Sequence, residues 1–253
     1  MSEIEIVKVD LGAVNARILA KEAKADFRRV EAASLKIPTR FTSAEGKRFF
    51  ARLFNTLQLN AHFISVIART RLDHGDVAKV EEAIRVQMET ATTTLNQAID
   101  GAEALFNTHG ITSTATYDTV PLDIDVHVLS SIGRRYLEVL GKLDQLMPLL
   151  QTLEIHEVLS TQEVDIQRAQ LKRKVRDIAN GARSFAMGLR RRMNAMTERV
   201  EETRGVAGNV RESLAKPQGG EIEGDVSGTL HGSDGLEEMI FPAEGRDVSA
   251  TDH

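Results

Sequence analysis

The stretch "YDTVPLDIDVHV", residues 117–128, alternates apolar and polar side chains in a chain whose other periodic stretches, apart from a short alternating start at residues 4–11, have a helical spacing. The apolar positions are Val120, Leu122, Ile124, Val126 and Val128. This period of two is typical of a β-strand with one buried face. Pro121 has no N–H for a ladder, which favours an edge strand or a two-stranded ribbon. The strand needs a partner, and we expect either the segment 4–9 or the same strand of a second subunit.

Before this strand, apolar residues recur every three or four positions, as in amphipathic helices. The pattern predicts a first helix over residues 14–30, with a break at Pro38. Thr42 and Glu45 have the spacing of a capping box and predict the start of a second helix. After a turn, the apolar stripe from Val77 to Leu105 predicts a long third helix.

Two further helices are predicted after the strand. Ser130 or Ser131 can cap the first of them, and Pro148 is expected to kink or interrupt it. Ser160 and Glu163 form a second capping-box pattern before the last helix, whose apolar seam has nearly coiled-coil spacing. The predicted fold class is therefore mainly α, with long amphipathic helices and one short β-strand or ribbon.

Composition excludes several classes of protein. The 253 residues include no cysteine, which rules out disulfides, Cys-ligated zinc and a thiol nucleophile. No apolar run approaches the roughly 20 residues that span a bilayer, and the charged start "MSEIEIVKVD" is unlike a signal peptide. The seven histidines are scattered, and neither a phosphate loop nor a nucleophile elbow is present. We expect a cytoplasmic protein without enzymatic activity, cofactor, metal or membrane attachment.

Charge divides the chain unevenly. The last 39 residues, 215–253, contain nine acidic and two basic residues, for a charge of −7; subtracting this from the −5 of the whole chain leaves +2 for residues 1–214. We predict three regions: an N-terminal helical region (1–112), a strand plus two-helix core with a basic helix (113–214), and an acidic disordered tail (215–253). The tail is a candidate for recruiting a protein partner, or for folding back on the basic helix.

The last helix is strongly basic. Residues 166–199 contain ten Lys or Arg and only two acidic residues, for a local charge of +8. Cations along an amphipathic helix can bind phosphates while the apolar seam packs inward, although such charges are often only a solvated helix face. The predicted nucleic-acid-binding residues are Lys172, Arg173, Arg176, Arg183, Arg190, Arg191 and Arg192.

A family resemblance extends over residues 117–200. It is carried by the proline-bearing strand, by the helix "GKLDQLMPLL" (141–150), by the link that follows it and by the basic helix. The residues concerned are Pro121, Asp144, Leu146, Thr152, Val158, Leu159, Lys172, Arg173, Lys174 and Arg176. In this order of elements the chain resembles the AcaB-like family of integrating conjugative elements and conjugative plasmids. The resemblance implies a ribbon-helix-helix-like, dimeric DNA-binding regulator whose ribbon enters the major groove.

The outward ribbon positions differ from what a groove-reading ribbon needs. They are Thr119, Asp123, Asp125 and His127. Two aspartates per strand repel phosphates, and such alternating positions are where solvent-facing polar residues belong, so we expect the basic helix to make the DNA contacts. The leading hypothesis is a homodimeric DNA-binding regulatory protein of a conjugative or mobile genetic element. The alternative is a non-catalytic helical scaffold that forms an oligomeric bundle.

Overall fold

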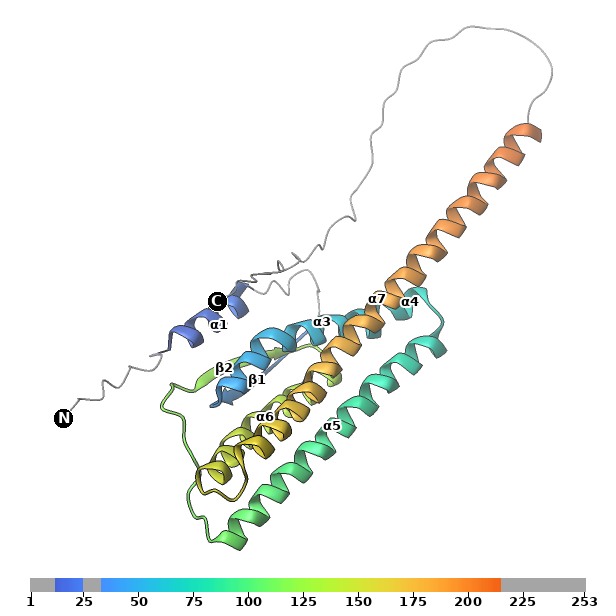
Figure 1. Cartoon of the computed structure of the whole chain (residues 1–253). Coiled ribbons are helices and arrows are strands. Elements are labelled where there is room, and N and C mark those ends of the chain that lie inside the picture. Colours follow the sequence, from blue (N-terminus) through green and yellow to red (C-terminus); the bar gives the residue numbers. More distant parts are fainter. Residues whose placement is uncertain (1–11, 25–32, 215–253) are drawn as a thin grey trace, which may run out of the picture. The chain divides into compact units, whose positions relative to one another are not determined.

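The structure, a computed structural model, describes residues 12–24 and 33–214, with side chains as far as residue 199 (Figure 1). Helices dominate it, and its single sheet has two antiparallel strands, which confirms the predicted mainly α class. The first half comprises α1 (Ala13–Lys24), β1 (Leu35–Phe41), α2 (Ala44–Phe49), the π-helical η2 (Phe50–Phe54), α3 (Asn55–His62), the π-helical η3 (Phe63–Ala68) and α4 (Arg69–Arg71). The second half comprises α5 (His74–His109), β2 (Leu122–Val128), α6 (Ser131–Ile155) and α7 (Thr161–Leu214).

The predicted strand is β2, but its predicted partner is wrong. β2 pairs with β1 of the same chain, with Leu35 opposite Val128 and Phe41 opposite Leu122. The alternation of β2 is confirmed, since Leu122, Val126 and Val128 are buried whereas Asp123 and Asp125 are exposed. The sequence does not indicate this partner, because Pro38 is typical of a helix break, although a proline is also tolerated in an edge strand such as β1.

The helix ends follow local capping chemistry, but two of the predictions about the helices need correction. The cap of α2 is Ser43, one residue after the predicted Thr42, and its hydroxyl accepts from Gly46 N–H. Pro148 lies inside α6 and does not end it. The Ser160–Glu163 capping box is confirmed: Ser160 N–H donates to Glu163 Oε2 at 2.9 Å, and Glu163 N–H donates to Ser160 Oγ at 3.3 Å.

Helix α6 is the centre of the packing. It contacts α5, α2 and α3, and its buried residues include Leu140, Leu143, Leu146 and Leu150. Tyr136 of α6 donates from its hydroxyl to the carbonyl of Val175 in α7 at 3.0 Å. Burying these side chains from several helices in one core supplies most of the stability that separate amphipathic helices lack.

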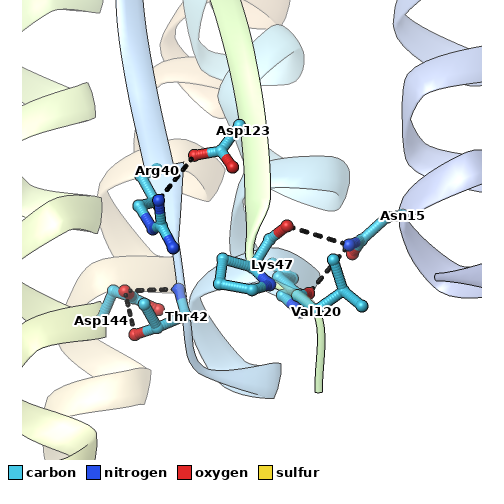
Figure 2. Close-up of polar contacts among 8 residues, drawn as sticks. Asn15, Arg40, Thr42, Lys47, Val120, Asp123 and Asp144 are labelled. Atoms are coloured by element: carbon cyan, nitrogen blue, oxygen red, sulfur yellow. Dashed lines mark hydrogen bonds and ion pairs between the residues drawn. The ribbon is translucent and has the colours of Figure 1, made fainter. Parts of the chain in front are cut away.

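A buried carboxylate joins α6 to the segment between β1 and α2 (Figure 2). Asp144 accepts four hydrogen bonds, from the N–H and hydroxyl of Thr42 and from the N–H and hydroxyl of Ser43, at 2.6 to 3.0 Å. A Cβ on Gly46 would overlap Asp144 Oδ1, so only glycine allows this close approach. We call Asp144, Thr42, Ser43 and Gly46 the Asp144 joint.

Side chains of α1 and α2 hold the start of β2 in place by donating hydrogen bonds to two backbone carbonyls just before it. Lys47 Nζ donates to the carbonyl of Val120 at 2.5 Å, and Asn15 of α1 donates to the same carbonyl at 2.8 Å (Figure 2). Asn15 also donates to the carbonyl of Pro121 at 3.1 Å. The loop that precedes β2 is therefore fixed by hydrogen bonds from α1 and from α2.

Candidate nucleic-acid interface

Most of the predicted apolar seam of α7 is buried, whereas Phe185 is partly buried and Met196, near the end of the predicted seam, is exposed. The buried residues recur mainly at steps of three, four or seven positions: Val164, Leu171, Val175, Ile178, Ala179, Ala182, Ala186, Leu189 and Met193. Because a helix places residues at about 100° intervals, the cations between these positions, apart from Arg168, lie on the sides and the outer face of α7. The sequence prediction that the cations lie outside the apolar seam therefore agrees with the burial of α7.

Three of the predicted residues are exposed cations without an ion-pair partner among the described residues. Arg176, Arg183 and Arg191 are exposed, and none of them forms an ion pair with a carboxylate of the described residues. Lys172, on the same side of α7 as Arg176, is half-buried. An exposed guanidinium without an internal partner keeps its five N–H donors for water or for an anion such as phosphate.

Two other predicted residues have carboxylate partners. Arg173 lies 3.9 Å from Asp177 on the same helix, and Arg192 donates to Asp76 of α5 at 3.0 Å. Three of the four side chains are largely exposed and Asp76 is about half exposed, and surface pairs of this kind contribute about 0 to 1 kcal/mol. These pairs are weak enough for a phosphate to displace them, but they reduce the net charge that α7 presents.

Arg190 is held by an aromatic ring that the sequence did not indicate. Its guanidinium lies 4.3 Å from the centroid of Phe63 in η3, a cation–π contact. Partial burial lowers the pKa of Arg190, because desolvation disfavours the charged form. Phe63 follows α3 by one residue, and no local sequence signal connects it with a position more than 120 residues later.

The opposite edge of α7 is bonded to α5. Lys174 Nζ donates to Thr94 Oγ1 at 3.0 Å, and Arg192 reaches Asp76 near the start of the same helix. Gly181 lies between them, and a Cβ there would be 2.9 Å from Gln87 Oε1. These three positions show that α5 and α7 run antiparallel.

One cation of the basic helix points into the protein. Arg168 donates to Gln151 Oε1 at 2.9 Å and lies 3.9 Å from Glu154, both on α6. Its side chain is only 16% exposed, so it belongs to the packing of α6 on α7. The local charge of +8 therefore overstates what the outer face of α7 offers to a ligand.

The four ribbon residues lie on or beside an intrachain sheet. Asp123 is 3.6 Å from Arg40, and Asp125 is paired with Pro38 across the ladder. The His127 ring shares a 3.0 Å hydrogen bond with Ser34, and Thr119 precedes β2 as a half-buried residue. Because β1 and β2 supply the sheet from one chain, the intersubunit ribbon that the resemblance implies is not required for pairing.

The part of the chain that the structure describes contains no group of three His, Cys, Asp or Glu side chains that could hold a metal ion. Among the described helices, none is both long and apolar enough to cross a membrane. What the described surface of α7 does offer is several exposed cations, on more than one side of the helix, and this arrangement is suited to binding a polyanion.

Comparisons with known proteins give one structural likeness. No protein-family model matches the chain, and no curated protein matches its sequence. The crystal structure of selenomethionine-containing AcaB from uropathogenic E. coli is similar, with a TM-score of 0.60 and 19% sequence identity, over 68% of this chain and 88% of that chain. At this identity the likeness concerns the fold alone. Over that length, the chain therefore shares the fold of AcaB.

Proposed function

We propose that this protein binds DNA through the exposed cations of α7 and acts as a regulatory protein of a conjugative or mobile genetic element. The observation that carries the proposal is the exposure of Arg176, Arg183 and Arg191 without internal carboxylate partners among the described residues. The AcaB-like fold is consistent with the resemblance that suggested this role. Contacts to phosphates give affinity that is independent of base sequence and falls steeply with salt.

The test removes these three cations together. The Arg176→Ala, Arg183→Ala, Arg191→Ala triple variant of the full chain is titrated with a fluorescent 30-base-pair duplex in an anisotropy assay at several salt concentrations. We expect the affinity to fall about tenfold or more at 0.1 M salt. The slope of log affinity against log salt should shrink, by up to about 0.9 for each phosphate that the variant no longer neutralises.

A matched control has the same change in net charge elsewhere. Arg134, Arg135 and Lys142 lie on sides of α6 that are turned about 100° or more from Tyr136, which faces α7. Their triple Ala variant should bind DNA within about twofold of wild type. Equal decreases in the affinity of both triple variants would mean that only net charge matters. No binding by the wild-type chain, together with a large oligomer in light scattering, would favour the helical scaffold instead.

A further inference from the structure

Helix α7 lies between two elements of opposite charge (Figure 1). Helix α5, on one side, has six acidic and two basic residues, for a formal charge of −4. The helical run from α2 to α4, residues 44–71, has five basic residues and one acidic residue, for a formal charge of +4. Two of these cations are engaged, since Arg69 is ion-paired with Glu81 of α5 and Lys47 is buried, which leaves Arg48, Arg52 and Arg71 as exposed basic residues. A polyanion on α7 therefore meets attraction on one side and repulsion on the other.

The side-chain contacts along the two edges of α7 agree with this difference in charge. On the α5 edge, Lys174 and Arg192 already donate to Thr94 and Asp76. On the other edge, Arg190 stacks on Phe63 of η3, and Arg183 lies seven residues earlier on the same side of α7. Arg183 has no ion pair with a described carboxylate, so this edge keeps an open cation beside a basic neighbour.

From helical periodicity, we expect Arg52 to be the cation of the neighbouring run on the same side as Phe63. Eleven residues, about three helical turns, separate the two positions, and the eight residues of α3 between them are α-helical. Positions three turns apart project from one side of a helix, about 16 Å apart along its axis. Arg52 is exposed, and no ion pair joins it to a carboxylate of the described residues.

We propose that Arg52 is a further phosphate-binding residue, and that the DNA surface spans the Phe63-side edge of α7 and Arg52 of η2 while excluding α5. The inference rests on the proposed function. Packed helices have axes about 8 to 10 Å apart, and the major groove of B-DNA is about 12 Å wide, so cations on two neighbouring helices can reach phosphates on both walls of a groove.

The experiment compares single substitutions in the full chain by salt-dependent anisotropy with the same duplex. Arg52→Ala should lower the affinity about threefold to tenfold and reduce the salt slope by about one unit. The matched control is Arg85→Ala on α5, an exposed arginine paired with Glu82, which should change the affinity less than twofold. Arg183→Ala should weaken binding more than Arg192→Ala, which removes a cation from the α5 edge.

The outcomes separate the two proposals. If the triple α7 variant fails to bind but Arg52→Ala behaves like Arg85→Ala, then DNA binds α7 without η2 and this inference is wrong. If Arg192→Ala weakens binding more than Arg183→Ala, the DNA lies on the α5 edge, which also overturns it. Absence of DNA binding by the wild-type chain would overturn the proposed function itself. Thermal melting of Arg52→Ala should match wild type, because the side chain is exposed.

Discussion

Asp144 and Arg183 are both charged side chains on long helices, yet their surroundings are opposite. Asp144 is 6% exposed and accepts four hydrogen bonds from Thr42 and Ser43. Arg183 is exposed and has no ion pair among the described residues. A buried charge persists only when its partners replace water, whereas an exposed charge stays available to a ligand.

The comparison separates residues that carry the fold from residues that can carry the function. Asp144, Leu146 and Thr152, which carry part of the family resemblance, all lie in the packing around α6. Thr152 Oγ1 donates to the carbonyl of Pro148 and accepts from Ala115 N–H, so it fixes the loop before β2. A resemblance based on such residues indicates a shared fold more directly than a shared ligand.

The largest expected effect tests the Asp144 joint. Asp144→Ala leaves four donors of Thr42 and Ser43 without their acceptor, and we expect the free energy of unfolding to fall by about 3 to 5 kcal/mol. Urea denaturation measures it. The control is Asp123→Ala, an exposed carboxylate 3.6 Å from Arg40, with an expected decrease of about 0.5 kcal/mol or less. Similar decreases in both variants would mean that burial does not distinguish the two carboxylates.

A smaller effect is expected from the glycine of the same joint. Gly46→Ala places a Cβ where it overlaps Asp144 Oδ1, and relieving this overlap should cost about 1 to 3 kcal/mol. Gly141→Ala in α6 is the matched control, because its Cβ would meet no atom within 4 Å and alanine favours a helix by about 0.5 to 1 kcal/mol. Calorimetric melting should show a lower Tm for Gly46→Ala and a higher Tm for Gly141→Ala than for the wild type. A stabilised Gly46→Ala variant would show that the joint is not tightly packed.

The smallest effect concerns Glu163, an exposed carboxylate that nevertheless has internal donors. Hydrogen bonds from the Ser160 hydroxyl and then from the Ser160 N–H lower the pKa of Glu163 below the ordinary glutamate value of about 4.3. A depressed folded-state pKa gives stability that is present above the unfolded-state pKa and is lost as the pH falls through the folded-state pKa.

The lowered pKa of Glu163 predicts how the stability of a Glu163 variant should depend on pH. Glu163→Gln should unfold at a lower urea concentration than wild type at pH 7, and the difference should close as the pH falls below about 4. A difference that stays constant from pH 7 to pH 3 would mean that the capping box does not depend on the charge of Glu163. Arg173→Gln provides a control for charge removal at another exposed position of α7.

Local periodicity in the sequence was enough to predict several elements. The stripe from Val77 to Leu105, the alternation in residues 120–128 and the Ser160–Glu163 capping box each predicted their element. Such patterns repeat over a few residues because a helix or strand presents every third, fourth or second side chain to one face. For the same reason, the exposure of Arg176 and Arg183 follows from their positions between the apolar residues of α7.

Only the tertiary structure decided the contacts between distant segments. The pairing of β2 with β1, the hydrogen bonds from Thr42 and Ser43 to Asp144 about 100 positions later, and the stacking of Arg190 on Phe63 join elements that no local pattern relates. The physical reason is that these contacts depend on how whole helices pack, which many side chains determine together. The sequence thus identified the cations of α7, and packing determined which of them have partners on α5 and η3.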